Sequence, residues 1–541
     1  MDTRLKQLAE NASVKLEEAF ASTVTFCCDL KEDLTVHHYI TRLDDTFERD
    51  KVSAARELGN LAKSSSKARA EVTSNAGCCS LLRLLRFGDD EGKQWAAYAL
   101  AYTALDNEEN AATIAEDGAI EPLVGLLSGT DGQKEYAALA LWILAKDSSA
   151  NREAIAMAGA IKLLVALLQD GADNLLESVS NALGSLATDS DTNCAEIVHE
   201  GAIAALVALL RRDSPTLTES AVCALWRVVQ SNKACAAEVV AAGAIPLLGA
   251  LLRGASKHWA MKLLAAVSGN IDANSAEIVR ATAIAPSIEL LQSGTDEEKE
   301  AAAELLAAVA GVSAVIRTDI SSAGAILTFV GLIREGSERQ KEYAVRALAN
   351  LAMGNESISS EIACEEVIVL VVKLLNFGTE GQQEAAARFV QSLAKDNPSN
   401  RAVIVEHGAI APLVSLVRHG TDQQKSSAAL ALGSLAEKNE ANSLEIARQE
   451  AIKPLVELGK SGSEELKTSA GYALRSLAGS NNKLRAEITR EGGKAALTVV
   501  KPGSDEQKAG SAKIAEKRSS SKLHKSRSFS QRVRAIFSSK A

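Results

Sequence analysis

Residues 118–145 read GAIEPLVGLLSGTDGQKEYAALALWILA, and this stretch contains most of the pattern that decides the fold. The triplet at 118–120 is followed by an apolar run with helical spacing, which ends at Gly129. Thr130 and Gln133 then fit a capping box, in which two side chains satisfy two backbone N–H groups at a helix start. The stretch therefore predicts a helix of medium length, a glycine break and a longer amphipathic helix.

The same pattern recurs along the chain at a nearly constant interval. The triplet Gly-Ala-Ile, or a degenerate form of it, begins at residues 77, 118, 159, 201, 243, 282, 324, 366, 408, 450 and 492. Only the interval between the starts at 243 and 282 is noticeably shorter than the others. So regular a series predicts a stack of structural repeats, each too small to bury its apolar face alone.

Capping boxes, glycines and asparagines recur at fixed places in this period. The predicted boxes are Thr130/Gln133, Thr295/Glu298, Ser337/Gln340, Thr379/Gln382, Thr421/Gln424 and Ser504/Gln507. We expect left-handed glycines to close the medium helix at Gly88, Gly129, Gly171, Gly254, Gly294, Gly336, Gly378, Gly420, Gly462 and Gly503. A third, shorter helix precedes each triplet, with N-cap candidates at Asn110, Asn151, Asn193, Asn274, Asn400 and Asn442. The unit is thus a short, a medium and a long helix.

Composition excludes several classes of protein. Of the 541 residues, 47% are hydrophobic, which provides enough apolar surface for a large core. The longest uncharged runs, 239–252 and 320–333, are shorter than the roughly 18 residues of a membrane-spanning helix. The eight cysteines contain no CxxC pair, which favours neither zinc nor a disulfide framework. We expect a cytoplasmic protein, with the nucleus as a second possible compartment.

Charge separates the C-terminal segment from the rest. Residues 508–541 contain ten Lys/Arg and one acid, Glu516, so their charge is +9 and that of the remaining chain is −10 − 9 = −19. We predict an N-terminal helical cap at 1–34, repeats at 35–505 and a basic, Ser-rich flexible tail at 506–541. Within the tail, the candidate regulatory residues are Arg527, Ser530, Arg532 and Arg534. Peripheral membrane contact, a partner, the chain's own repeats and no specific partner remain as alternatives for this tail.

The repeat unit resembles the armadillo repeat of catenins, importin-α adaptors and vacuolar armadillo-repeat proteins. The resemblance implies an all-α, right-handed α-α superhelix of about eleven three-helix units, monomeric and with one elongated binding groove. HEAT repeats, typically with two helices, are the alternative fold. In armadillo proteins the third helices line the groove, and an asparagine near the helix end binds the main chain of an extended peptide.

Matching positions supply the candidate groove residues. The asparagine position holds asparagine only at Asn60 and Asn350, and no tryptophan occurs four residues earlier, which argues against a nuclear-import receptor. Basic residues at these two positions favour acidic or phosphorylated extended segments, with ordinary solvated side chains as the alternative. The candidate site comprises Asn60, Arg227, Lys262, Arg346, Asn350 and Arg388. We expect the four tryptophans, Trp95, Trp142, Trp226 and Trp259, to pack in the core or between repeats, with stacking on a ligand as the alternative.

No catalytic motif is found. A nucleophile elbow, a phosphate-binding loop, a dinucleotide fingerprint, a metalloprotease helix and a zinc-spaced Cys/His set are all missing from the sequence. We therefore expect no catalytic residue, no cofactor, no metal site and no direct contact with nucleic acid. The sequence favours a non-enzymatic protein-interaction scaffold or adaptor. A nuclear-import cargo adaptor and a regulatory subunit of an enzyme complex remain as alternatives.

Overall fold

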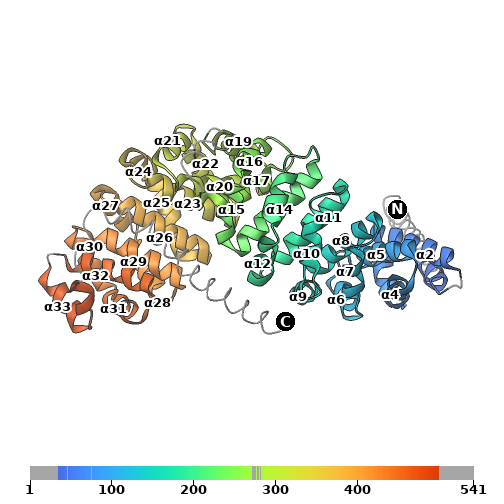
Figure 1. Ribbon diagram of the computed structural model, residues 1–541. Coiled ribbons are helices and arrows are strands. Elements are labelled where there is room, and N and C mark those ends of the chain that lie inside the picture. Colours follow the sequence, from blue (N-terminus) through green and yellow to red (C-terminus); the bar gives the residue numbers. More distant parts are fainter. Residues whose placement is uncertain are drawn as a thin grey trace, which may run out of the picture. The chain divides into compact units, whose positions relative to one another are not determined.

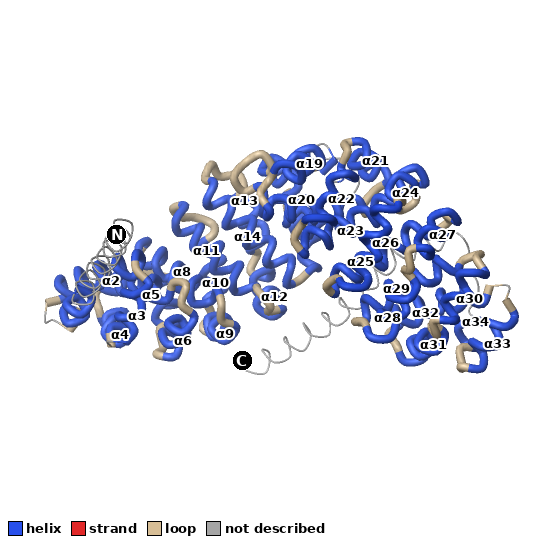
Figure 2. Tube along the Cα trace, turned by 180° about the vertical axis from the view of Figure 1, so that it is seen from behind, coloured by secondary structure: helices blue, strands red, loops and turns tan. Residues whose placement is uncertain are grey.

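The computed structural model of the chain describes residues 35–44, 47–74, 76–270, 276, 279–280, 282–479 and 481–498. Every regular element in these residues is a helix (Figure 2). The chain divides into two compact units between residues 270 and 271. This boundary falls within 243–282, the one short interval between triplets. The predicted cap at 1–34 and tail at 506–541 lie outside the described residues.

The first unit consists of repeats of a short, a medium and a long helix, as predicted (Figure 1). Its third, long helices are α2 (Glu48–Ser64), α5 (Asp90–Ala104), α8 (Asp131–Lys146), α11 (Asp173–Ala187), α14 (Pro215–Ser231) and α17 (Lys257–Val267). Its first helices are α3 (Ser66–Ser74), α6 (Glu108–Glu116), α9 (Ser149–Met157), α12 (Asp191–His199) and the pair η1 (Lys233–Cys235) and α15 (Ala236–Ala241). Its second helices are α4 (Gly77–Phe87), α7 (Ile120–Leu126), α10 (Ala160–Leu167), α13 (Ala202–Leu209) and α16 (Ala244–Leu251), and η2 (Ser268–Asn270) follows α17.

The second unit has the same organisation. Its third helices are α20 (Asp296–Ala310), α23 (Glu338–Ala352), α26 (Glu380–Ala394), α29 (Asp422–Ala436) and α32 (Glu464–Ala478). Its first helices are α21 (Ala314–Ser322), α24 (Glu356–Ile362), α27 (Pro398–Glu406), α30 (Glu440–Arg448) and α33 (Asn482–Arg490). Its second helices are α19 (Ile284–Ser293), α22 (Ala325–Glu335), α25 (Glu365–Phe377), α28 (Ile410–His419), α31 (Ile452–Ser461) and α34 (Lys494–Thr498).

Third helices of consecutive repeats pack side by side within each unit, and small residues let them approach closely. In α8, Ala137, Leu141 and Leu144 are almost completely buried. At Gly184 of α11, a Cβ atom would lie only 3.0 Å from the Cα atom of Ala224 in α14, so a side chain there would push the helices apart. Burying a leucine side chain stabilises the folded state by about 1.5–3 kcal/mol. The buried leucines of the third helices therefore form the core of each stack.

The predicted capping boxes are confirmed wherever the structure describes them. Both reciprocal hydrogen bonds are present in the boxes that begin at Thr130, Thr295, Ser337, Thr379 and Thr421. The sixth box, at Ser504, lies outside the described residues.

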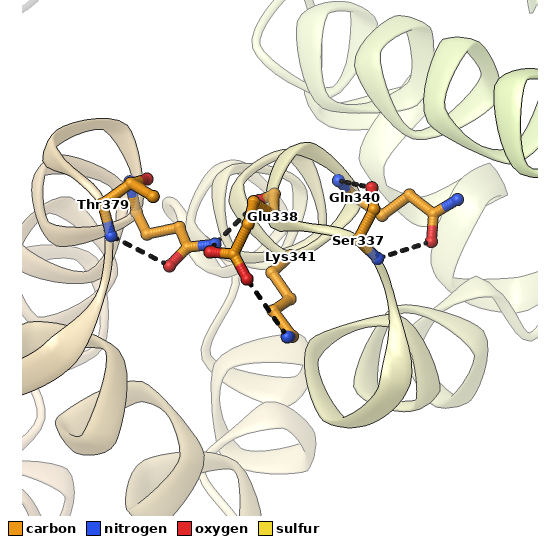
Figure 3. Close-up of polar contacts among 6 residues, drawn as sticks. Ser337, Glu338, Gln340, Lys341 and Thr379 are labelled. Atoms are coloured by element: carbon orange, nitrogen blue, oxygen red, sulfur yellow. Dashed lines mark hydrogen bonds and ion pairs between the residues drawn. The ribbon is translucent and has the colours of Figure 1, made fainter.

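The glutamine of a capping box also joins neighbouring repeats, a role that the sequence pattern did not predict. Gln382 Oε1 accepts from the Thr379 N–H at 3.1 Å, and its Nε2 donates to the Glu338 carbonyl oxygen of the preceding repeat at 2.8 Å (Figure 3). Gln340 donates in the same way to the Asp296 carbonyl oxygen at 2.9 Å. A glutamate can accept from the cap but has no N–H to donate. Glutamine therefore caps its own helix and ties it to the previous one.

The predicted asparagine N-caps are wrong. The cap lies three residues earlier, as at Ser190, whose hydroxyl accepts from the Asn193 N–H. Asn193 is buried inside the helix, and its Nδ2 donates to the Leu186 carbonyl oxygen at 3.0 Å. Asn110, Asn151, Asn400 and Asn442 make the equivalent bond, and Asn274 lies outside the described residues. The asparagine therefore satisfies a carbonyl at the end of the preceding third helix.

The prediction of left-handed glycines is also wrong at the breaks between second and third helices. Gly336 and Gly378 have φ of −70° and −76°, which other residues also adopt. Glycine fits there because a Cβ atom would lie 2.5 Å from the carbonyl oxygen four residues earlier. The left-handed glycines are instead the first residues of most triplets, such as Gly118 (φ +82°) and Gly201 (φ +85°), where the chain turns between first and second helices.

Candidate functional site

The six candidate groove residues all lie on third helices, but the structure gives them different neighbours. Asn60, Arg227 and Lys262 lie on α2, α14 and α17 of the first unit. Arg346 and Asn350 lie on α23, and Arg388 lies on α26, in the second unit. The candidate regulatory residues Arg527, Ser530, Arg532 and Arg534 lie outside the described residues.

Lys262 and two tryptophans are in contact on the adjacent helices α14 and α17 (Figure 1), and Arg227 directly follows one of these tryptophans, Trp226, on α14. The Trp226 and Trp259 ring centroids are 5.2 Å apart. Lys262 Nζ lies 5.4 Å from the Trp226 ring centroid and 5.2 Å from that of Trp259, both within cation–π range. All four side chains are half-buried. We call Trp226, Arg227, Trp259 and Lys262 the α14–α17 cluster.

The two cations of the α14–α17 cluster have no carboxylate partner among the described residues. Arg227 Nη1 donates to the neutral Ser185 hydroxyl at 3.3 Å, and the Lys262 ammonium faces aromatic rings. Burial raises the pKa of the neighbouring Cys223 thiol, and so does the Glu219 carboxylate, while Arg227 and Lys262 act in the opposite direction. Within the described residues, the two cations therefore form no ion pair, although the Glu219 carboxylate also acts on the Cys223 thiol.

An unused hydrogen-bond donor lies in the same cluster. The Trp226 indole Nε1 is buried and has no hydrogen-bond partner in the described part of the chain. A buried N–H group without a partner costs about 1–3 kcal/mol, so such groups often await a ligand or water. An N–H donor beside two cations is suited to an anionic oxygen.

The arginines of the second unit already have acidic partners. Arg346 Nη1 lies 3.3 Å from Glu342 Oε1, and Arg388 Nη1 lies 3.5 Å from Glu384 Oε1. Each pair is separated by four residues on one helix. Asn350 Nδ2 donates to the Ala307 carbonyl oxygen at 2.8 Å, so it binds the end of the preceding third helix. These three candidates are therefore engaged within the protein.

The same face of α23 contains a wider polar network. Arg339 Nη1 lies 3.4 Å from Glu300 Oε1 on α20, and the Arg339 Nη2 group donates to the Tyr343 hydroxyl at 3.4 Å. Burial and the nearby Glu304 carboxylate raise the pKa of Tyr343 to about 12, so the phenol stays neutral at physiological pH. Positive and negative groups thus alternate on this part of the second unit.

Asn60 lies at the edge of an aromatic group on α5 and α8. Its Oδ1 accepts from the Tyr98 hydroxyl at 3.0 Å. Tyr98 also contacts Tyr102 and Tyr136, with ring centroids 4.8 and 4.9 Å apart, and burial raises its pKa. Trp95 joins the group, 5.6 Å from Tyr136. Asn60 is exposed, but its carbonyl oxygen is engaged locally.

Trp95, Trp226 and Trp259 pack between repeats, as the prediction of core or inter-repeat packing allows. Trp95 contacts Tyr136, and Trp226 contacts Trp259, each across two adjacent third helices. All four tryptophans are half-buried. Trp259 lies three residues before Lys262, a spacing that places both on one helix face and could have revealed the cluster.

Two classes of site were searched for directly in the structure. Within the described residues, no three His, Cys, Asp or Glu side chains come together as metal ligands would. In the same residues, no single helix is both long and apolar enough to cross a membrane. Four pairs of consecutive helices meet that test only when counted together, and each pair is bent by 75° to 91° at its junction.

Comparison with known proteins agrees with this architecture. The family model of the plant U-box protein ARM repeat region matches residues 50–257, and that of the armadillo/beta-catenin-like repeat matches residues 397–437. No curated protein matches at a significant level.

Solved structures show the same fold. A crystal structure of an engineered protein is 25% identical, with a TM-score of 0.50, covering 82% of this chain and 99% of the engineered one. A structure from work on a phosphorylation switch in the cadherin–beta-catenin interaction is 14% identical, with a TM-score of 0.60, covering 83% of this chain and 91% of its own. The repeat pattern, the three-helix units and these matches together show an all-α fold of armadillo-type repeats, and the chain is similar to armadillo-repeat proteins over the residues that the two family models match.

Proposed function

We propose that this protein is a non-enzymatic scaffold whose α14–α17 cluster binds a carboxylate or phosphate group of an extended protein segment. Armadillo-repeat proteins act as protein-interaction scaffolds, and their fold is typically without enzymatic activity. The observation that supports this proposal is the combination of two cations that form no ion pair within the described residues with a buried Trp226 N–H that has no hydrogen-bond partner among those residues.

The chemistry of the cluster favours an anionic group over a cationic or purely apolar one. The Arg227 guanidinium can donate two parallel hydrogen bonds to a carboxylate or phosphate, which a neutral amide cannot match. Lys262 adds a second positive charge, and the two indole rings offer apolar surface to neighbouring side chains of the ligand. An incoming lysine or arginine would meet like charge at both cations.

A related system offers support for a segment that carries phosphate. The beta-catenin structure similar to this chain comes from work on a phosphorylation switch that controls cadherin binding. Here, the paired arginines of α23 and α26 would add only weakly to such binding, because a ligand must first displace Glu342 and Glu384. The α14–α17 cluster requires no such displacement.

Binding of short labelled peptides to the full chain tests this function. The probes are a peptide of alternating glutamate and serine, the same peptide with its serines phosphorylated, and a neutral glutamine–serine control, measured by fluorescence anisotropy. We expect binding of at least one acidic probe, weaker binding with added salt, and none of the neutral control.

Charge reversal then localises the binding. We expect R227E/K262E to weaken binding strongly and R211E/R253E, which changes the net charge equally, to leave it unchanged. Arg211 and Arg253 are exposed and follow the second helices α13 and α16, away from the cluster. Equal loss in both double variants would show only general charge attraction and would refute the proposed site. Equal binding of the neutral peptide would refute the proposed ligand class.

A further inference from the structure

Two exposed apolar side chains occupy the same position in consecutive repeats of the second unit. Leu327 on α22 is 81% exposed and Val369 on α25 is 46% exposed, and each lies three residues after the start of its triplet. The two helices are adjacent (Figure 1). The other repeats in which this position is exposed have alanine, proline or a charged residue there: Glu121, Lys162, Ala204, Pro246, Ala285, Ala411, Lys453 and Ala495. The repeat fold itself therefore does not require a large apolar residue at this position.

The apolar surface continues along both helices. Val330 and Val372 lie three residues after Leu327 and Val369, on the same helix faces, and are half-buried. Phe377 lies eight residues after Val369, a spacing that returns to the same face of α25, and it is 84% exposed. We call Leu327, Val330, Val369, Val372 and Phe377 the α22–α25 apolar surface. Exposed apolar side chains gathered on adjacent helices mark an interaction site, whereas single ones are common on any protein.

The C-terminal segment of the same chain, outside the described residues, has a matching apolar pattern. Phe529, Val533, Ile536 and Phe537 follow the spacing i, i+4, i+7 and i+8, which is typical of the apolar face of a helix. Eight residues separate the first and last of these side chains, or about 12 Å along a helix. The exposed apolar residues of α25 also extend over eight residues, from Val369 to Phe377, so the two apolar faces match in length.

Charge and chain length both favour this segment as the occupant. Residues 325–335 and 361–377 contain four carboxylates and two cations, so their charge is −4 + 2 = −2, whereas residues 508–541 carry +9. Acids around the apolar surface attract a basic segment and repel an anionic membrane. The described chain ends at residue 498 in α34, three repeats after α25, or about 30 Å away at 8–10 Å for each helix. The 31 residues from 498 to 529 can span up to about 100 Å.

We propose that residues 529–537 bind as a short helix to the α22–α25 apolar surface of the same chain. The apolar face of the segment packs on the exposed side chains of the two second helices. Arg532 and Arg534 then provide positive charge near the carboxylates of Glu365 and Glu366 at the start of α25. This surface lies on second helices of the second unit, whereas the α14–α17 cluster lies on third helices of the first unit. The chain thus has separate sites for its own C-terminal segment and for an anionic ligand.

Photo-cross-linking in the full chain tests this contact. Phe537→p-benzoylphenylalanine places a photoreactive ring in the segment, and the irradiated protein is separated by denaturing electrophoresis and digested for mass spectrometry. We expect a monomeric product in which residue 537 is joined to a peptide from α22 or α25. Cross-links only to third helices would place the segment elsewhere on the chain, and cross-linked dimers would identify a second copy as the partner. Either result, or the absence of any cross-link, would overturn the proposal.

The repeats themselves supply a variant that should fold and a matched control. L327K/V369K introduces lysine at the position where α10 and α31 already have it, so we expect an unchanged melting temperature. The yield of the cross-link should fall about tenfold, because the segment loses apolar contacts. The control A285K/A411K adds the same two charges at the equivalent exposed positions of α19 and α28, and should keep the cross-link. If A285K/A411K lowers the yield as much as L327K/V369K does, charge repulsion alone explains the loss and the assigned surface is wrong.

Discussion

Lys262, Arg346 and Arg388 occupy the same position in their repeats, yet their surroundings differ. Each arginine is bonded to a glutamate four residues before it, whereas Lys262 lies over two indole rings. Arg227, one turn beyond that position on α14, donates to a serine. Cations at the same repeat position therefore differ in their capacity to bind an anionic group. The residue one helical turn earlier decides whether a cation is already neutralised.

Charge reversal should give the largest difference between the two regions. We expect R227E/K262E to weaken binding of the acidic peptide about hundredfold or more, because two charge-assisted hydrogen bonds are lost. In contrast, R346E/R388E should change affinity by about threefold at most, since these arginines are already paired. Fluorescence anisotropy measures both. A larger loss of affinity in R346E/R388E than in R227E/K262E would show that the second unit, not the first, binds the acidic peptide.

Removing only the indole N–H should give the next largest effect. Trp226→Phe keeps an aromatic ring but loses the unpartnered donor, so we expect about tenfold weaker binding. The free energy of unfolding should stay the same or rise by about 1 kcal/mol, because an unsatisfied buried donor disappears. Chemical denaturation measures stability, and Trp95→Phe is the matched control for binding. A clear loss of stability in W226F would mean that the N–H is bonded in the free protein.

A glutamate placed before Lys262 should make the first region resemble the second. His258 lies four residues before Lys262, so His258→Glu creates the spacing that pairs Arg346 and Arg388 with their glutamates. An exposed ion pair contributes about 0.2–1 kcal/mol, so the acidic peptide should bind up to about fivefold more weakly. The neutral H258Q variant separates the charge effect from loss of the imidazole. Equal affinities of H258E and H258Q for the acidic peptide would show that an ion pair with Lys262 does not affect peptide binding.

The smallest effect should come from removing the glutamates that pair with Arg346 and Arg388 in the second unit. Glu342→Gln with Glu384→Gln removes both acidic partners, and we expect the acidic peptide to bind about twofold to threefold more tightly, since each pair contributes about 0.3–0.5 kcal/mol. Isothermal titration calorimetry resolves a change of this size. The double variant E361Q/E457Q alters acids outside the third helices and should leave affinity unchanged. Weaker binding in E342Q/E384Q would contradict the assigned role of the pairs.

The repeat architecture could be predicted from sequence because several local rules agree on one period. The Thr379/Gln382 box appears in the structure as expected, with both reciprocal bonds. The prediction failed where one residue type has two physical uses. Gly378 was expected to be left-handed, but it serves close approach to a carbonyl oxygen. Asn193 was expected to cap a helix, but it bonds inward to the preceding helix.

The candidate site could be predicted only in part. The spacing of Glu342 and Arg346 is visible in the sequence, and it could have separated paired arginines from unpaired cations. The contact between Trp226 and Trp259 depends on how adjacent helices pack, since the two residues do not share a repeat position. Whether an indole N–H lacks a partner depends on every neighbouring atom. That property could not be obtained from residue spacing.

The most direct test follows the indole N–H itself during binding. The chain has four tryptophans, so its ¹H–¹⁵N spectrum should contain four indole signals, and W226F assigns that of Trp226. Addition of the acidic peptide should shift the Trp226 Nε1–H proton downfield, as a new hydrogen bond to an anionic oxygen does, and leave the Trp142 signal in place. A bound peptide that leaves the Trp226 signal unmoved would contradict the α14–α17 cluster as the site where the anionic group binds.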